Sequence, residues 1–294
     1  MRFFLVLIFL AVAARAEQQP PFGALPELAF DKLSDRMISA LGQKALTIRP
    51  KDWKHAETAH FVYHFFDRPM ASAVSVEAEF HYRVIAAELG KDTALWERKC
   101  HLFLFDDEAD WKQFQKCGGL DPWTGGIHGE GALFIRRNPG WQAENGTLPH
   151  EITHLVLYRF FGQGIPLWLN EGFAEYAATR CRASFYRARG FNSRPRAASV
   201  NAAHYIPLAE LTTAVSYPAD ELQVIAFYEE SQKLVRFLCA ADRKAFAVLL
   251  ESLGNGARLE TAFGKSYGTR FLNLESIERE FKGYATSPLI PSTP

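Results

Sequence analysis

The segment HEITH at residues 150–154 places two histidines four residues apart, which puts them on one face of an α-helix, one turn above each other. Both imidazoles can then reach one metal ion, and Glu151, beside that face, can accept a proton from a water that attacks a substrate. The flanking residues favour a helix, because Pro149 is tolerated in a first turn and Gly162 follows a run of apolar residues. We therefore expect a helix over Leu148–Phe161 that carries a metal site.

A second helix, expected over Pro166–Arg182, could supply the rest of that site. It follows a short turn with two glycines, which could fold it back alongside the first helix. A catalytic zinc takes three protein ligands and leaves one position open for water. Glu171 and Glu175 lie one turn apart on the same helical face, so spacing alone leaves either of them as the third ligand.

These two segments together resemble the gluzincin metallopeptidases, the clan of thermolysin and aminopeptidase N. The pattern is HEITH, sixteen further residues, and then the Glu of WLNEGFAEY. The resemblance implies that His150, His154 and Glu171 bind zinc and that Glu151 is the general base. Thermolysin-like enzymes usually have Asp one turn after the third ligand, where it orients a zinc histidine, and Glu175 stands at that place. The alternative for Glu175 is a solvated helix charge.

The segment FYEES at residues 227–231 resembles the Tyr-Glu-Lys-Gly segment of the zinc aminopeptidases. The tyrosine of that family stabilises the oxyanion of the tetrahedral intermediate, which implies this role for Tyr228. A buried structural tyrosine is the alternative, because the expected helix Ala219–Ala240 places apolar residues on the same face. Those residues are Val224, Val235 and Leu238.

Two departures from the aminopeptidases bear on the reaction. The family strand Gly-Ala-Met-Glu-Asn, which holds the free amine of the substrate, has no counterpart, and Gly129–Phe134 occupies its place. We therefore expect cleavage of internal bonds, with Glu130 as the first candidate if an amine is bound after all. The chain is also much shorter than an aminopeptidase and resembles the compact, secreted, peptidase MA-like bacterial proteins.

The remaining pattern predicts an α+β fold in which a small mixed sheet with helices packs beside a helical lobe. The resemblance implies a zincin-like arrangement with the active site between the two parts. Short apolar runs predict three strands, and two stretches between them predict helices. The strands are His60–Phe66, Cys100–Phe105 and Ala132–Arg136, and the helices are Ser75–Leu89 and Asp106–Lys116.

The N-terminus has the pattern of a signal peptide over residues 1–16. A positive start precedes an unbroken apolar run, and Ala14-Arg15-Ala16 suits a signal peptidase. The run is too short to span a bilayer, so we expect an exported protein, periplasmic or extracellular, without stable membrane insertion. The expected domain covers 17–285, with an α/β part at 17–140, a helical part at 141–285 and a disordered tail at 286–294.

Charge and cysteine content exclude several classes of protein. Lys plus Arg and Asp plus Glu both total 33, so no net basic charge exists to hold nucleic acid. Six arginines between Arg180 and Arg196 could bind an anionic substrate or could form a solvated loop. The four cysteines lack the paired spacing of structural zinc sites. In an exported chain we expect disulfides, Cys100 with Cys117 and Cys181 with Cys239, against the alternative of free thiols.

The sequence thus predicts an exported metallopeptidase that holds one zinc ion per chain and hydrolyses a peptide or protein substrate. Two alternatives keep the same expected fold. One is a non-catalytic exported binding protein, which the intact Glu151 disfavours because a structural zinc site does not need a general base. The other is a zinc amidase that acts on a non-peptide amide, for example in the cell wall.

Overall fold

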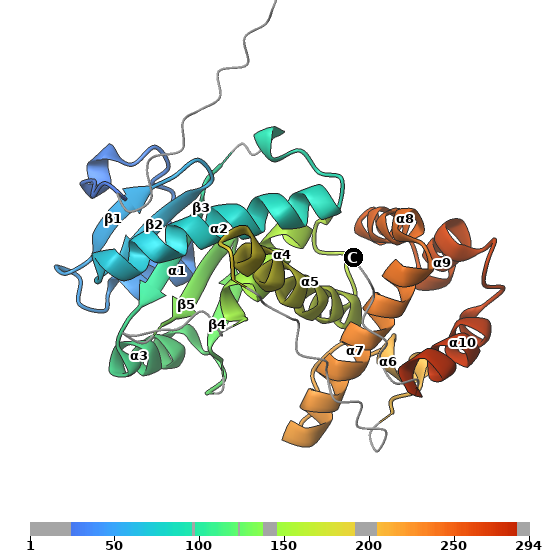
Figure 1. Ribbon diagram of the computed structural model, residues 1–294. Helices are drawn as coiled ribbons and strands as arrows, with labels where there is room; N and C mark the ends of the chain where they lie inside the picture. The colour runs from blue at the N-terminus through green and yellow to red at the C-terminus, as the bar shows by residue number, and fades with distance from the viewer. Residues whose placement is uncertain (1–24, 96–97, 123, 138–145, 192–204, 287–294) are drawn as a thin grey trace, which may run out of the picture.

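The computed structural model describes residues 25–95, 98–122, 124–137, 146–191 and 205–286 (Figure 1). The expected signal peptide, 1–16, lies outside the described residues, as does the expected disordered tail beyond Thr286. In the part described, no helix is both long and apolar enough to cross a membrane.

A five-stranded mixed sheet forms one side of the molecule, in the order β1-β2-β3-β5-β4 (Figure 1). The three central strands run parallel to one another, and β1 and β4 lie antiparallel at the two edges. The strands are β1 (Lys54–Glu57), β2 (Phe61–Phe65), β3 (Cys100–Phe105), β4 (Gly126–Gly129) and β5 (Ala132–Arg136). The three expected strands are confirmed as the central ones, whereas the sequence analysis missed both edge strands.

Side chains of the central strands alternate between two hydrophobic cores, as the strand period of two requires. In β2, Phe61, Tyr63 and Phe65 face the larger core, which also contains α2 (Arg68–Glu88), α4 (Thr147–Phe161) and α5 (Leu167–Ala188). The other face of the sheet packs in a smaller core against α1 (Ala40–Leu46) and α3 (Glu108–Gly118). The sheet is therefore covered by helices on both faces.

The chain from α4 onward is helical among the described residues, which confirms the expected α+β class with a helical lobe. The lobe continues through α6 (Leu208–Leu211), α7 (Glu221–Ala241), α8 (Arg243–Gly254), α9 (Leu259–Tyr267) and α10 (Leu274–Thr286). Two 3-10 turns, Phe30–Lys32 and Thr93–Leu95, complete the elements. The larger core runs without a break from the sheet to Phe281 in α10, so the two parts share one hydrophobic interior.

Helix α5 is longer than the sequence analysis predicted, because it ends at Ala188 rather than at Arg182. Gly190, with a φ of 81°, follows the C-terminus in the left-handed conformation that favours glycine. The expected basic loop is therefore wrong for the part that directly follows Arg182, since Arg187 lies on α5, whereas Arg180 and Arg182 lie on the helix as expected. The second half of that segment, from residue 192, lies outside the described residues.

Helices α5 and α7 lie close together at Gly172. A Cβ atom at this position would collide with the backbone carbonyl of Ser231, so only glycine allows this separation. The close approach brings the N-terminal half of α7 beside the segment of α5 that carries Glu171, which places Tyr228 at the site described below.

All four cysteines are free thiols, so the two expected disulfides are wrong. Cys181 and Cys239 both lie near the carboxylate of Glu88, as expected for helices that bring them to the same level. Cys117 is exposed, whereas Cys100 is buried in β3.

Candidate metal centre

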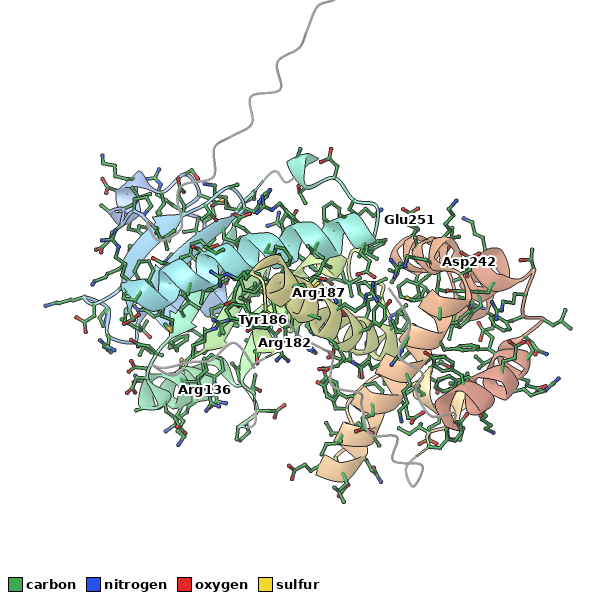
Figure 2. All side chains as sticks on the ribbon, in the orientation of Figure 1. Arg136, Arg182, Tyr186, Arg187, Asp242 and Glu251 are labelled. Carbon is green, nitrogen blue, oxygen red and sulfur yellow. The ribbon has the colours of Figure 1, made fainter. Side chains whose placement is uncertain are left out.

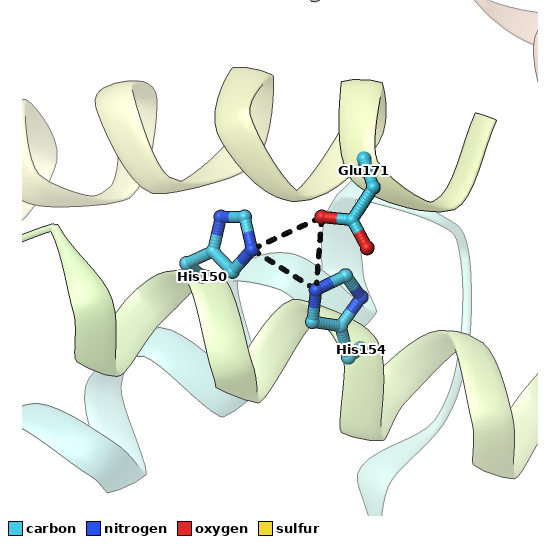
Figure 3. Close-up of side chains that lie close together, drawn as sticks. All are labelled: His150, His154 and Glu171. Atoms are coloured by element: carbon cyan, nitrogen blue, oxygen red, sulfur yellow. Dashed lines mark hydrogen bonds and ion pairs between the residues drawn. The ribbon is translucent and has the colours of Figure 1, made fainter. Parts of the chain in front are cut away.

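Helices α4 and α5 bring three ligand atoms together, although Glu171 lies 17 residues after His154 in the sequence (Figure 3). The Nε2 atoms of His150 and His154 are 3.0 Å apart. Glu171 Oε2 lies 3.4 Å from the first of these atoms and 3.5 Å from the second. These three side chains form a group that could hold a metal ion.

The separations of the three atoms match those of ligands around a small metal ion. Metal–ligand bonds of about 2.0–2.1 Å in tetrahedral geometry place neighbouring ligand atoms about 3.3–3.4 Å apart. Glu171 Oε2 is also buried without a hydrogen-bond partner, which is unfavourable for a carboxylate oxygen unless a cation or proton lies beside it. The residues therefore fit a metal ion that takes two nitrogen ligands and one oxygen ligand.

A second partner fixes the orientation of each of these three side chains. His150 Nδ1 lies 3.0 Å from Glu175 Oε1, and His154 Nδ1 lies 2.8 Å from Asn170 Oδ1. Both oxygens are acceptors, so each Nδ1 carries the proton and each Nε2 presents its lone pair toward the other ligands. The hydroxyl of Tyr217 donates a hydrogen bond of 2.7 Å to Glu171 Oε1.

The charges of the site are strongly coupled. Burial raises the pKa of Glu171, but His154 and His150 outweigh it and hold that pKa well below its usual range. Burial lowers the pKa of His150, yet the carboxylates of Glu171 and Glu175 outweigh it and raise that pKa well above its ordinary value. Protons therefore occupy this group readily when no metal is bound.

Glu151 lies beside the three ligands and does not join them. Its side chain is buried, with 7% exposure, and burial raises its pKa. The backbone N–H of His128 in β4 donates a hydrogen bond to its carboxylate. Gly126 in the same strand has no side chain, and a Cβ there would collide with Thr147 and press against Glu151. The strand thus holds the carboxylate at the site: its hydrogen bond lowers the pKa of Glu151, but burial outweighs this effect and that pKa stays raised.

Tyr228 lies at the site and not in the hydrophobic core. Its ring centroid is 6.4 Å from that of His150, and its ring stacks on Tyr217 at 5.9 Å. Val224 and Tyr228 line the open end of the α7 face, and Ser231 and Val235 continue it against Gly172. One face of α7 therefore contributes residues both to the site and to the hydrophobic core. For this reason the sequence alone could not decide whether Tyr228 belongs to the site or is a buried structural tyrosine.

The three ligands open into a cleft of about 830 Å³. Its walls come from the β4 segment, from α4 and α5, and from the start of α7 with the turn that precedes it. The cleft thus lies between the edge of the sheet and the helical lobe. Glu151 and the three side chains of the group all line this cleft.

The sequence analysis missed three residues of this cleft. Asn170 and Tyr217 hold two of the candidate ligands, and His128 lies in β4 and lines the cleft. The sequence could have indicated Asn170, because this residue directly precedes Glu171 in the WLNEGFA segment. Glu130, the candidate for an amine, instead accepts a hydrogen bond of 3.0 Å from the backbone N–H of Leu41 at the start of α1.

Comparison with known proteins gave no matching family model and no match among curated proteins. The chemistry of the site therefore has to be argued from the residues and their geometry.

Proposed function

We propose that the protein is an exported zinc metallopeptidase of the gluzincin type. The observation that carries this proposal is the placement of Glu151 beside the His150, His154 and Glu171 group in one open cleft. Two imidazoles and one carboxylate are the ligands of many catalytic zinc sites. A structural zinc site instead closes its coordination with four protein ligands and needs no neighbouring base.

The residues divide the reaction between them. A bound zinc ion would polarise the carbonyl of the scissile bond and bring the pKa of the attacking water toward neutrality. Glu151 accepts the proton of that water and passes it to the leaving amine.

Tyr228 serves as the donor to the negative charge that develops on the carbonyl oxygen. Its ring lies next to His150 at the cleft, and its burial raises the pKa of its hydroxyl, so the hydroxyl stays protonated and donates. Glu175, Asn170 and Tyr217 keep the three ligand atoms in place. Rigid ligands reduce the reorganisation that substrate binding would otherwise require.

The edge strand β4 supports a peptide as the substrate. It pairs with β5 on one side only, and Gly126, Ile127 and His128 line the cleft. An extended peptide can add to such an edge through backbone hydrogen bonds. A non-peptide amide would gain nothing from a strand edge beside the metal ligands.

The test is digestion of a peptide library with and without a chelator, read by mass spectrometry. We expect cleavage that the chelator stops and that added zinc restores. Glu151→Gln should keep the metal and lose nearly all cleavage, because an amide cannot accept the proton, whereas Glu210→Gln on α6 should cleave normally. Chelator-resistant cleavage, or full activity in Glu151→Gln, would contradict the proposal. A metal-loaded protein that cleaves no peptide would point to another amide or to a binding protein.

A further inference from the structure

The arginines on the C-terminal half of α5, among them Arg182 and Arg187, which Figure 2 labels, differ in their contacts. Arg180 Nε lies 3.4 Å from Glu88 Oε1, and Arg187 donates a hydrogen bond of 3.2 Å to Ser184 Oγ. The guanidinium of Arg189 lies over the ring of Phe185 at 4.9 Å. These three side chains have structural partners and do not line the cleft.

Arg182 lines the cleft, and no such partner for it is found in the described part of the chain. Its Nε atom is buried without a hydrogen bond, and among the described residues no carboxylate lies within ion-pair distance of its guanidinium. A Cβ at Gly146, the residue before α4, would lie 3.7 Å from Arg182 Nη1. This contact distance places the guanidinium next to Gly146, at the N-terminus of the helix that carries His150.

The surroundings of Arg182 carry an excess of positive charge. Glu77 is the nearby carboxylate, and its closest cation is Arg137, whose Nη2 lies 3.5 Å away. The positive charges of Arg137, Arg182 and Arg189 all act on this one carboxylate. His81, which also lies near Arg137 and Arg182, is neutral in this environment. Among the described residues, the Glu77 carboxylate near Arg182 thus faces three guanidinium groups, of which only that of Arg182 lines the cleft.

We propose that Arg182 binds a carboxylate of the substrate and selects peptides that carry one near the cleaved bond. A guanidinium that is partly desolvated, lacks a partner and opens into a substrate cleft is suited to a planar carboxylate, which it can bind through two parallel hydrogen bonds. The carboxylate can belong to an acidic side chain or to a free C-terminus. This inference rests on the proposed peptidase function.

The position of Arg182 also limits where that carboxylate lies. Gly146 precedes His150 by four residues, so along the axis of α4 the guanidinium and the ligand group are separated by about one helical turn, about 6 Å. One extended residue spans about 3.3–3.6 Å. The bound carboxylate therefore lies within two residues of the scissile bond.

Equilibrium binding tests this inference without hydrolysis. The probes are two pairs of short acetylated peptides: one pair differs by Glu against Gln and ends in an amide, and the other differs by a C-terminal acid against an amide. Isothermal titration into the zinc-loaded Glu151→Gln protein gives the affinity ratio within each pair. We expect at least one carboxylate peptide to bind about 10- to 100-fold more tightly than its neutral partner, as charged hydrogen bonds allow.

Arg182→Met in the same background keeps most of the apolar stem and should bring that ratio to within about twofold of one, whereas Arg182→Lys should keep part of it. Arg187→Met, which removes an equal charge from the same helix outside the cleft, should keep the full ratio. The peptide pair whose two members differ in affinity shows whether Arg182 binds an acidic side chain or a free C-terminus. Equal binding within both pairs, or a ratio that survives Arg182→Met, would overturn the inference.

The library digest separates this inference from the proposed function. If discrimination depends on Arg182 while the wild-type protein cleaves no peptide, the carboxylate site stands and the peptidase proposal fails. If the protein cleaves peptides with no acidic group or C-terminus within two residues of the cleaved bond as fast as those with one, the carboxylate site fails and the peptidase proposal stands.

Discussion

At the scale of single residues, the candidate metal site consists of three side chains that could bind the ion and three partners that hold them. Glu175, Asn170 and Tyr217 each contact a different ligand on the side away from the other ligand atoms. Two of these partners come from α5 itself. Tyr217 comes from the turn before α7, so it ties the metal group to the helix that carries Tyr228.

Tyr217→Phe should lower the affinity for zinc by about 10- to 100-fold, because the Glu171 carboxylate loses the hydrogen bond that orients it. Competition with a chromogenic chelator measures this change. Tyr205 makes a matched control, since its hydroxyl donates a bond of the same 2.7 Å length to Glu278, far from the cleft. Equal zinc affinity in Tyr217→Phe and Tyr205→Phe would show that Tyr217 does not support the ligand.

Tyr228→Phe should lower kcat by about 10²–10³ with little change in KM, as expected for the loss of one donor to the transition-state oxyanion. The zinc content of the variant should stay the same, because the Tyr228 hydroxyl is bonded to none of the three ligands in the structure. Steady-state kinetics on one peptide from the library decides the matter. Normal turnover by Tyr228→Phe would mean that another group donates the hydrogen bond to the oxyanion.

At the scale of elements, α5 organises the site. It carries Glu171 and both neighbouring partners, it packs against α4, and it extends to Arg182 at the end of the cleft. Its contact with α7 depends on Gly172, which lets the backbone of α7 approach at Ser231.

Gly172→Ala should destabilise the protein by about 1–3 kcal/mol, because the new methyl group collides with a backbone carbonyl that cannot rotate away. Activity should fall as well, since a shift of α7 moves Tyr228. Gly264→Ala in α9 is the control: no atom lies within 4 Å of its Cβ position, so alanine should stabilise that helix by about 0.5–1 kcal/mol. Urea unfolding compares the two variants, and similar effects of both would contradict the proposed close contact.

The sequence predicted the elements whose signals are local. The HEITH spacing required a helix, and the continuous apolar runs identified the three buried strands. Strand β4 lacked such a signal, because Gly126 and Gly129 have low strand propensity and the strand exists through its pairing with β5. Tyr217 contacts Glu171 across 46 residues, with no periodic pattern to indicate the contact. Such contacts depend on tertiary packing, which a single sequence does not display.

At the scale of the whole molecule, several histidines outside the metal group are buried in neutral form. His64 is fully buried and links His55 to His101 through contacts of 2.9 Å on each side of its ring. Burial lowers the pKa of all three. These histidines are structural, and they make the fold sensitive to acid.

His81 gives the clearest test, because it is 1% exposed and burial, with Arg137 and Arg182 nearby, lowers its pKa to about 3. The unfolded chain protonates histidine near pH 6.5. Between that pH and the folded pKa, the unfolded state binds a proton that the folded state rejects, so stability falls as the pH falls. His81→Gln should reduce this dependence by up to about 1.4 kcal/mol per pH unit between pH 6 and 4. Urea unfolding of the two metal-free proteins at several pH values measures this change. Equal slopes of unfolding free energy against pH in the wild type and in His81→Gln would contradict the prediction.

The central claim is that His150, His154 and Glu171 hold one zinc ion beside Glu151. Anomalous diffraction from crystals of the zinc-loaded protein, collected on both sides of the zinc absorption edge, tests it most directly. The account predicts one peak per chain at about 2.0–2.2 Å from the two Nε2 atoms and from Glu171 Oε2, and no peak at this place in His154→Ala. A zinc peak elsewhere with none at these three atoms, or full zinc occupancy there in His154→Ala, would contradict it.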